Sequence, residues 1–103
     1  SHSIHSHWVG STQHLLLRIM DIYHKFTKYT NTTINGVTFP PSMRGFIVSH
    51  NNGNLVCDLY TFTPSGATES NTINTVAGTH FFPIRLSGIS APSASSATYL
   101  IAF

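Results

Sequence analysis

Turn-forming residues recur at short intervals through the last two thirds of this chain and divide it into short segments. They are Asn35-Gly36, Pro40-Pro41, residues 51–54, Pro64-Ser65-Gly66 and Ala77-Gly78. The segments between these turns are rich in β-branched and aromatic residues, which predicts strands at residues 44–49, 55–63, 72–76, 80–89 and 97–103. Several short strands separated by regular turns favour an antiparallel sandwich or barrel.

The chain has 103 residues, which is the size of one domain with one core. We therefore predict a mainly β fold, a small antiparallel β-sandwich or barrel, formed by residues 31–103. An N-terminal arm at residues 1–10 and an amphipathic helix with its linker at residues 11–30 should precede it.

The helix prediction depends on residue spacing before the first turn. Ser11 and Thr12 are N-cap candidates for a helix of about 14 residues. Its apolar face is predicted to carry Leu16, Ile19, Tyr23 and Phe26, and its polar face Arg18, Asp21, Lys25 and Lys28. The alternative is a strand at residues 12–27, but that arrangement would mix charged and apolar residues on each face.

Both faces of the predicted 55–63 strand are largely apolar, with Asp58 as the only charge, which is unusual for a small sheet with one buried side. Leu55, Cys57 and Leu59 share one face, and Val56, Tyr60 and Phe62 share the other. A sandwich core on one side and a subunit interface on the other is the simplest explanation. The alternative is a compact monomer whose exposed apolar residues have no partner.

Large aromatic residues are the candidates for contacts between subunits, because buried aromatics dominate binding energy. Phe81 and Phe82 should point to opposite faces of their strand, so only one of them belongs in the core. The final strand ends on Phe103 without a polar tail, and we expect this terminus to be packed. The full set of interface candidates is Trp8, Tyr60, Phe62, Phe81, Phe82, Tyr99 and Phe103.

The chain is poor in charge. Charged residues make up 8% of the sequence, against about 25% in ordinary soluble domains. Ser and Thr together occupy 26 positions, so the polar surface is built from neutral groups. Little electrostatic repulsion then keeps copies apart, and we expect a homo-oligomer, with a trimer as the first choice.

The remaining composition argues against several partners. The net charge is +2, and Asp21 interrupts the cations between Arg18 and Lys28, so nucleic-acid binding is not expected. No stretch approaches the roughly 20 apolar residues of a membrane span, and residues 1–7 do not resemble a signal peptide. Synthesis in the cytoplasm is expected.

No arrangement of residues predicts catalysis or a cofactor. Cys57 should be a buried, inert thiol, and the few carboxylates include only one weak pair, Asp58 and Glu69. No nucleophile elbow or phosphate-binding loop is present. His2, His5 and His7 have a spacing that can bind a transition metal, with a polar arm as the alternative, so His5 and His7 are minor metal candidates.

Residues 31–103 carry a series of short motifs. They are Asn31-Thr32-Thr33, Arg44-Gly45-Phe46-Ile47-Val48, Asn52-Gly53-Asn54, Ala77-Gly78-Thr79, Pro83-Ile84-Arg85 and the closing segment 97–103. This pattern resembles small virion proteins of tailed phages and gene transfer agents, of the capsid decoration, cement or head-spike base type. The loop at residues 90–96 departs from the Gly-Thr-Thr type turn that is common in that family.

The resemblance implies a structural role without catalysis. Its expected partners are the major capsid protein or other virion proteins, and its expected location is the virion, assembled in the host cytoplasm. A protein that binds only the assembled shell stabilises it by mass action, and repeated weak contacts add through avidity. The alternatives are a tail or neck component and a small carbohydrate- or receptor-binding β module.

Overall fold

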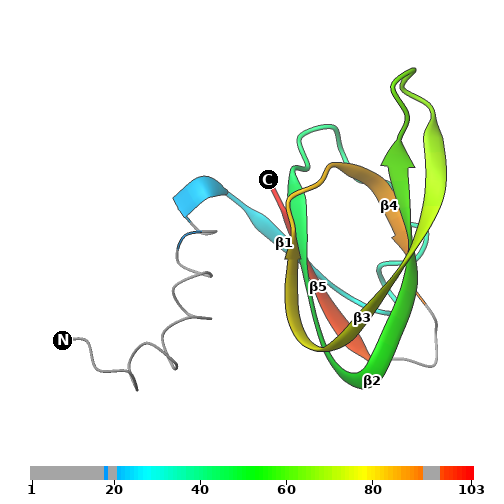
Figure 1. Ribbon diagram of the computed structural model, residues 1–103. Helices are drawn as coiled ribbons and strands as arrows, with labels where there is room; N and C mark the ends of the chain where they lie inside the picture. The colour runs from blue at the N-terminus through cyan, green and yellow to red at the C-terminus, as the bar shows by residue number, and fades with distance from the viewer. Residues whose placement is uncertain (1–17, 19–20, 92–95) are drawn as a thin grey trace.

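Five antiparallel strands form the domain (Figure 1). The computed structural model describes residue 18 and residues 21–91 and 96–103. The strands are β1 (Phe26–Thr30), β2 (Gly45–Phe62), β3 (Thr68–Phe82), β4 (Leu86–Ser90) and β5 (Ala97–Ala102). The predicted mainly β, antiparallel fold is confirmed.

A long hairpin of β2 and β3 is the frame of the fold. The first half of β2 pairs with β5, its second half pairs with β4, and β3 runs along its other edge. Strand β1 adds to the far side of β5, which gives the order β1-β5-β2-β3 with β4 on β2. Because the hairpin bends sharply near its middle, its two halves curve around a shared interior, as Figure 1 shows.

The predicted turns at residues 51–54 and 77–78 are wrong. The chain does not reverse at either place. Instead, the register of β2 against β3 shifts between His50 and Asn54, which is an irregularity of the β-bulge kind in two continuous strands. Gly78 has a φ of 128°, in the region that favours glycine, so it supplies the matching distortion on β3.

The predicted strand at residues 80–89 is also divided. β3 ends at Phe82, and β4 begins at Leu86 after a connection that contains Pro83. Proline has no amide hydrogen for a ladder bond, so a strand break at this residue is expected.

The turn at Pro64-Ser65-Gly66 is confirmed. Gly66 N donates to Thr63 O at 2.9 Å, and Thr63 N donates to Ala67 O at 2.7 Å. Pro64 fits the second position of a type I turn, and Gly66 has a φ of 89°, which the following bulge position requires.

The predicted helix is wrong at its C-terminal end. Asp21 and Ile22 are helical, whereas Tyr23 is not, and Phe26 already pairs with Ala102 as the first residue of β1. Residues 26–30 satisfy their backbone groups against β5, and this tertiary pairing overrides the helical spacing. The remainder of the predicted helix, the arm at residues 1–10, Trp8 and the three arm histidines lie outside the described residues.

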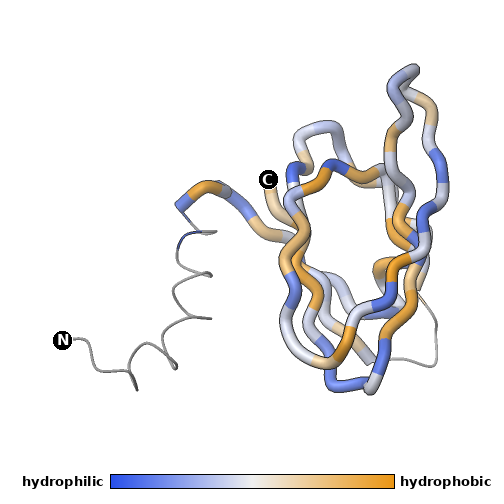
Figure 2. Tube along the Cα trace, viewed as in Figure 1, coloured by the Kyte–Doolittle hydropathy of each residue, from blue (hydrophilic) through white to orange (hydrophobic). Residues whose placement is uncertain are grey.

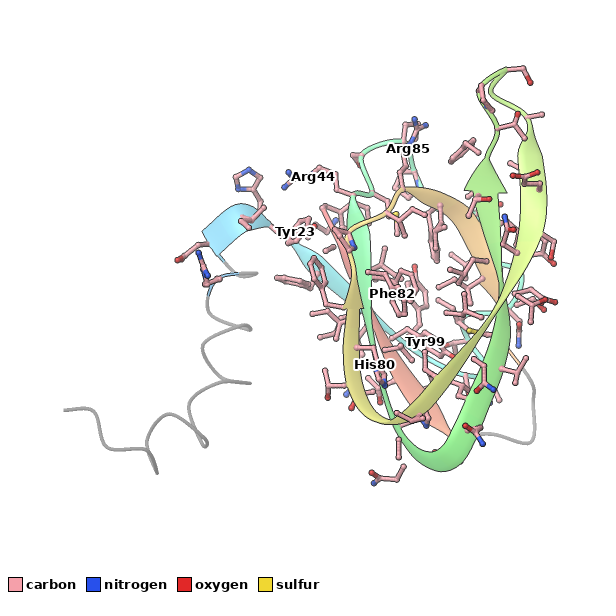
Figure 3. The ribbon with its side chains drawn as sticks, viewed as in Figure 1. Tyr23, Arg44, His80, Phe82, Arg85 and Tyr99 are labelled. Carbon is pink, nitrogen blue, oxygen red and sulfur yellow. The ribbon has the colours of Figure 1, made fainter. Side chains whose placement is uncertain are left out.

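The core lies between the two halves of the bent hairpin. Hydrophobic residues alternate with hydrophilic ones along the strands (Figure 2). Phe46 is fully buried and stacks on Phe82 with ring centroids 4.8 Å apart, and Figure 3 shows Phe82 and Tyr99 directed into this interior. The other large, fully buried side chains are Ile34, Met43, Val48, Leu55, Leu86, Ile89 and Ile101.

Candidate functional site

An apolar strip lies on the outer face of β2. It consists of Val56, Tyr60 and Phe62, which are 47%, 38% and 37% exposed. Asp58 lies on the same face between Val56 and Tyr60, where its Oδ1 accepts a hydrogen bond from Thr72 Oγ1 at 2.6 Å. Leu55, Cys57 and Leu59 alternate with the residues of this face and are buried in the core. The predicted core face is confirmed, and the three apolar residues of the other face are partly exposed; the subunit interface predicted there stays a prediction.

One cation is associated with the strip. The Arg85 guanidinium lies 4.6 Å from the centroid of the Phe62 ring, a cation–π arrangement in the connection between β3 and β4. The neighbouring Ile84 is 38% exposed. The strip therefore has an apolar surface with a positive edge, which is a composition that binding surfaces favour.

A groove of about 530 Å³ opens beside Tyr60. One wall is the connection from β1 to β2, and the other is β4. The lining mixes apolar atoms with neutral polar groups and consists of residues 35–38, Tyr60 and residues 87–91. None of these lining side chains is an acid, a histidine or a cysteine.

Asn35 fixes the wall of this groove. Its Nδ2 donates to Asn31 O and to Ala91 O, each at 3.0 Å, and its Oδ1 accepts from Ala91 N at 2.7 Å. The Asn35-Gly36 turn therefore lies in a connection clamped to the end of β4. The predicted turn is present, and it does not join two paired strands, because β1 and β2 are not neighbours in the sheet.

Gly88 allows the connection to lie close to β4. A Cβ at this position would lie 2.9 Å from the Val37 carbonyl oxygen, which is backbone and cannot rotate away. We expect Gly88→Ala to lower the free energy of unfolding by about 1–3 kcal/mol, as overpacking does, measured by urea denaturation. Gly53→Ala is the matched control: its Cβ would meet nothing within 4 Å, so its stability should stay within about 0.5 kcal/mol of wild type. Equal effects would contradict the close contact.

A second apolar cluster lies on the opposite, outer side of the β5–β2–β3 sheet. Phe81 belongs to it and contacts Tyr23, with ring centroids 5.9 Å apart. Arg44 lies 4.7 Å from the Tyr23 ring centroid and donates from Nη2 to Ile22 O at 2.9 Å (Figure 3). Gly45 leaves space for Tyr23, since a Cβ there would lie 2.8 Å from its hydroxyl.

The structure separates the predicted interface residues into distinct groups. Tyr60 and Phe62 are exposed, whereas Phe81 and Phe82 are partly buried against two different clusters of the same domain. The prediction that Phe81 and Phe82 occupy opposite faces is confirmed, but the residue outside the core is covered by Tyr23.

Two further interface candidates, Tyr99 and Phe103, pack within the domain itself. Tyr99 is fully buried, so as an interface residue it is a wrong prediction. Phe103 donates its amide to Lys25 O, accepts from His24 N, and packs partly against the core. The expectation of a packed Phe103 is confirmed.

Cys57 is an inert thiol, as predicted. It is 3% exposed, and burial, followed by the nearby Asp58 charge, raises its pKa to about 11. A thiol with such a pKa is protonated at neutral pH and is a poor nucleophile.

Two histidines that are 30 residues apart in sequence lie close together at the bend of the hairpin. The His50 and His80 ring centroids are 6.3 Å apart. His50 Nε2 shares a hydrogen bond of 2.9 Å with Thr75 Oγ1, and His80 Nε2 is 2.7 Å from Val76 O. Since His50 and Thr75 are both buried, this pair links the strands rather than presenting a nucleophile to solvent.

No metal or membrane-spanning element is evident within the described range. Residue 18 and residues 21–91 and 96–103 contain no group of three His, Cys, Asp or Glu side chains that could hold a metal ion. In this part of the chain, no helix has the length and apolar character needed to cross a bilayer.

Comparison of the chain with protein family models, with curated proteins and with solved structures finds no match. The residues of the strip, the groove and the outer cluster are therefore the basis for a functional proposal.

Proposed function

We propose that this chain is a structural virion protein of a tailed phage that binds the capsid surface as a cement or decoration protein, or as the base of a fibre or spike. The observation that carries the proposal is the apolar strip of Val56, Tyr60 and Phe62, which the described part of the chain leaves partly exposed. The motif resemblance of residues 31–103 supplies the class of partner.

The low charge of the chain supports this role. A surface of Ser, Thr and Asn around an aromatic strip can be buried against a neighbouring subunit without removing many ions from water. The groove and the strip contribute no catalytic group, so binding is the activity that they support. A shell protein that buries such a strip across a seam stabilises the assembled state.

Truncating the strip should weaken particle binding. We expect Tyr60→Ser/Phe62→Ser to bind particles at least about tenfold more weakly, because aromatic anchors typically contribute about 2 kcal/mol or more when buried in an interface. The measurement is co-sedimentation of purified protein with particles of the phage that encodes this sequence.

Ile22→Ser is the matched control for this experiment. Ile22 is 56% exposed and also presents apolar surface, but it lies at the opposite outer cluster. Its binding should equal that of wild type. Absence of wild-type binding, or equal binding by the double variant and wild type, would contradict the proposal.

A carbohydrate-binding β module is the second candidate, and the groove favours it. Tyr60 offers an aromatic ring at the rim, and Thr38, Ser87 and Ser90 contribute hydroxyl groups beside it. A glycan screen in which Tyr60→Ala abolishes binding and Phe62→Ala does not would favour this function over shell binding.

A further inference from the structure

Within residues 21–91 and 96–103, no strand lies beside the outer edge of β3. β3 is terminal in the order β1-β5-β2-β3, so residues 68–76 pair with β2 on one side only. This stretch of nine residues is longer than an average strand. All of its residues are exposed except Ile73 and Thr75.

The hairpin turn determines which backbone groups point outward. Thr63 N donates to Ala67 O, and hydrogen-bonded pairs alternate along an antiparallel ladder from that point. Glu69, Asn71 and Ile73 therefore direct their amide and carbonyl groups to β2. It follows that Ser70, Thr72 and Asn74 direct theirs away from the sheet, to the free edge.

This edge lacks the features that normally prevent strands from pairing. Residues 68–76 contain no Lys, Arg or Pro, and their register against β2 is unbroken from Asn54↔Val76 to Phe62↔Thr68. Natural edge strands are usually short, charged, bulged or covered. Glu69 is the one charged residue in this stretch.

We propose that β3 pairs antiparallel with β3 of a second copy of this chain, about a two-fold axis at Thr72. By the same alternation Thr68 and Val76 also direct their backbone groups outward, and these residues together with Ser70 and Asn74 are arranged symmetrically about Thr72, so each set can bond its equivalent in the other copy. In this register, Ser70 lies opposite Asn74 of the second copy. Glu69 lies opposite Thr75, so the single charge of each strand does not meet its own copy.

We choose a second copy of this chain as the partner of β3 because the strand matches itself in the register centred on Thr72. An isologous two-fold contact needs a surface that matches itself, and this strand does so in hydrogen bonding and in charge. The inference rests on the oligomeric part of the proposed function, for which it names a dimer instead of the trimer first expected. Pairing would also extend one sheet across both copies and present two apolar strips together.

Charges introduced at residues 70 and 74, which lie opposite each other in the proposed dimer, test the register. Ser70 and Asn74 are both exposed, so substitution should not disturb the fold. Ser70→Lys/Asn74→Lys places like charges opposite each other, and Ser70→Lys/Asn74→Glu places opposite charges there. By sedimentation equilibrium, wild type should approach twice the 11.3 kDa chain mass as concentration rises. The Lys/Lys variant should dissociate at least about tenfold more readily, and the Lys/Glu variant should pair at least as well as wild type.

A proline substitution provides an independent test of the same edge. Thr72→Pro removes an outward amide hydrogen and leaves the backbone bonds to β2 intact, so it should yield a folded monomer by circular dichroism and sedimentation. Thr72→Val keeps the amide and the β-branched shape, and should remain a dimer. Thr72→Pro also removes the bond from Thr72 Oγ1 to Asp58 Oδ1 on β2, a loss that the valine control shares. A wild type that is monomeric at about 100 μM, or a Lys/Lys variant that pairs as well as wild type, would overturn the inference.

The same proteins separate this inference from the proposed function. A dimer that does not bind particles would leave the edge pairing valid and contradict the virion role. A monomer that binds particles through Tyr60 and Phe62 would support the virion role and contradict the edge pairing.

Discussion

Replacing Phe46 by Ala should lower the free energy of unfolding by about 3–5 kcal/mol, as removal of a buried phenyl group does. Phe46 has no exposed surface and stacks on Phe82 at 4.8 Å with an interplanar angle of 17°. Both halves of the bent hairpin enclose this ring, so they cannot close the cavity without shifting. Because small domains have a total stability of about 5–15 kcal/mol, the variant should lose a large share of its stability.

Urea denaturation of wild type and variant measures this loss. Phe62→Ala is the matched control, because Phe62 lies on the same strand and is 37% exposed on the outer face. We expect its loss to stay below about 1.5 kcal/mol, mostly through the contact with Arg85. Equal losses at the two positions would show that the core does not lie between the halves of the hairpin.

The alternation within the second half of β2 could be read from the sequence. The difference between Phe46 and Phe62 could not, because an even number of residues separates them and the register shift between His50 and Asn54 exchanges the two faces of β2. A strand places neighbouring side chains on opposite faces, so Leu55, Cys57 and Leu59 had to share one environment and Tyr60 and Phe62 another. This rule needs only local geometry. The separation of the strip from the core residues of β2 follows from it, whereas the turn at Pro64 follows from the local preferences of proline and glycine.

The bend of the hairpin could not be predicted in the same way. Asn and Gly at residues 51–54 suit a chain reversal and a bulge equally well. Only the pairing of His50 with Gly78 and of Asn54 with Val76 decides for continuous strands. Local propensity carries no information on this long-range choice.

The burial of Tyr99 and the covering of Phe81 have a similar explanation. Alternation places Tyr99 on one face of β5, but only the arrangement of β5 beside β2 makes that face the interior. Tyr23 reaches Phe81 across 58 residues of sequence. The clamp from Asn35 to Ala91 and the closeness of His50 to His80 likewise depend on tertiary contacts.

The two halves of the hairpin have different surfaces, and this difference bears on function. On the first half, the outer face is covered by Tyr23 and its neighbours. On the second half, the outer face keeps Val56, Tyr60 and Phe62 exposed, and β3 keeps a free edge next to them. The strip on β2 would bind the shell through side chains, and the edge of β3 would pair through backbone groups. The two contacts therefore use different atoms and can occur together.

The protein should lose stability at alkaline pH because two acidic groups are buried in its core. Burial raises the pKa of Cys57 from 9.0 to about 11, with the Asp58 charge as a second cause. Burial also raises the pKa of Tyr99 from 10.0 to about 12, and the Cys57 thiolate adds to it. Both folded values exceed the unfolded ones, so this contribution is fully present below about pH 9 and is lost as the pH rises to about 11 and above.

The expected loss from Cys57 alone is roughly 2 kcal/mol between about pH 8 and pH 10.5, since one pKa unit corresponds to about 1.4 kcal/mol. Urea denaturation across this range measures it. Cys57→Ala should be less stable than wild type at pH 8, because it leaves a small cavity, but its stability should fall less steeply as the pH rises.

Tyr99→Phe distinguishes the phenol from the thiol. Among the described residues, the Tyr99 hydroxyl is buried without a hydrogen-bond partner, so removing it should not lower stability at pH 8 and should raise it by up to about 1 kcal/mol. The remaining alkaline loss in this variant should come from Cys57 and begin near pH 9. If neither variant changes the slope with pH, the two groups are not buried together in the folded core, and the alkaline loss must come from other residues.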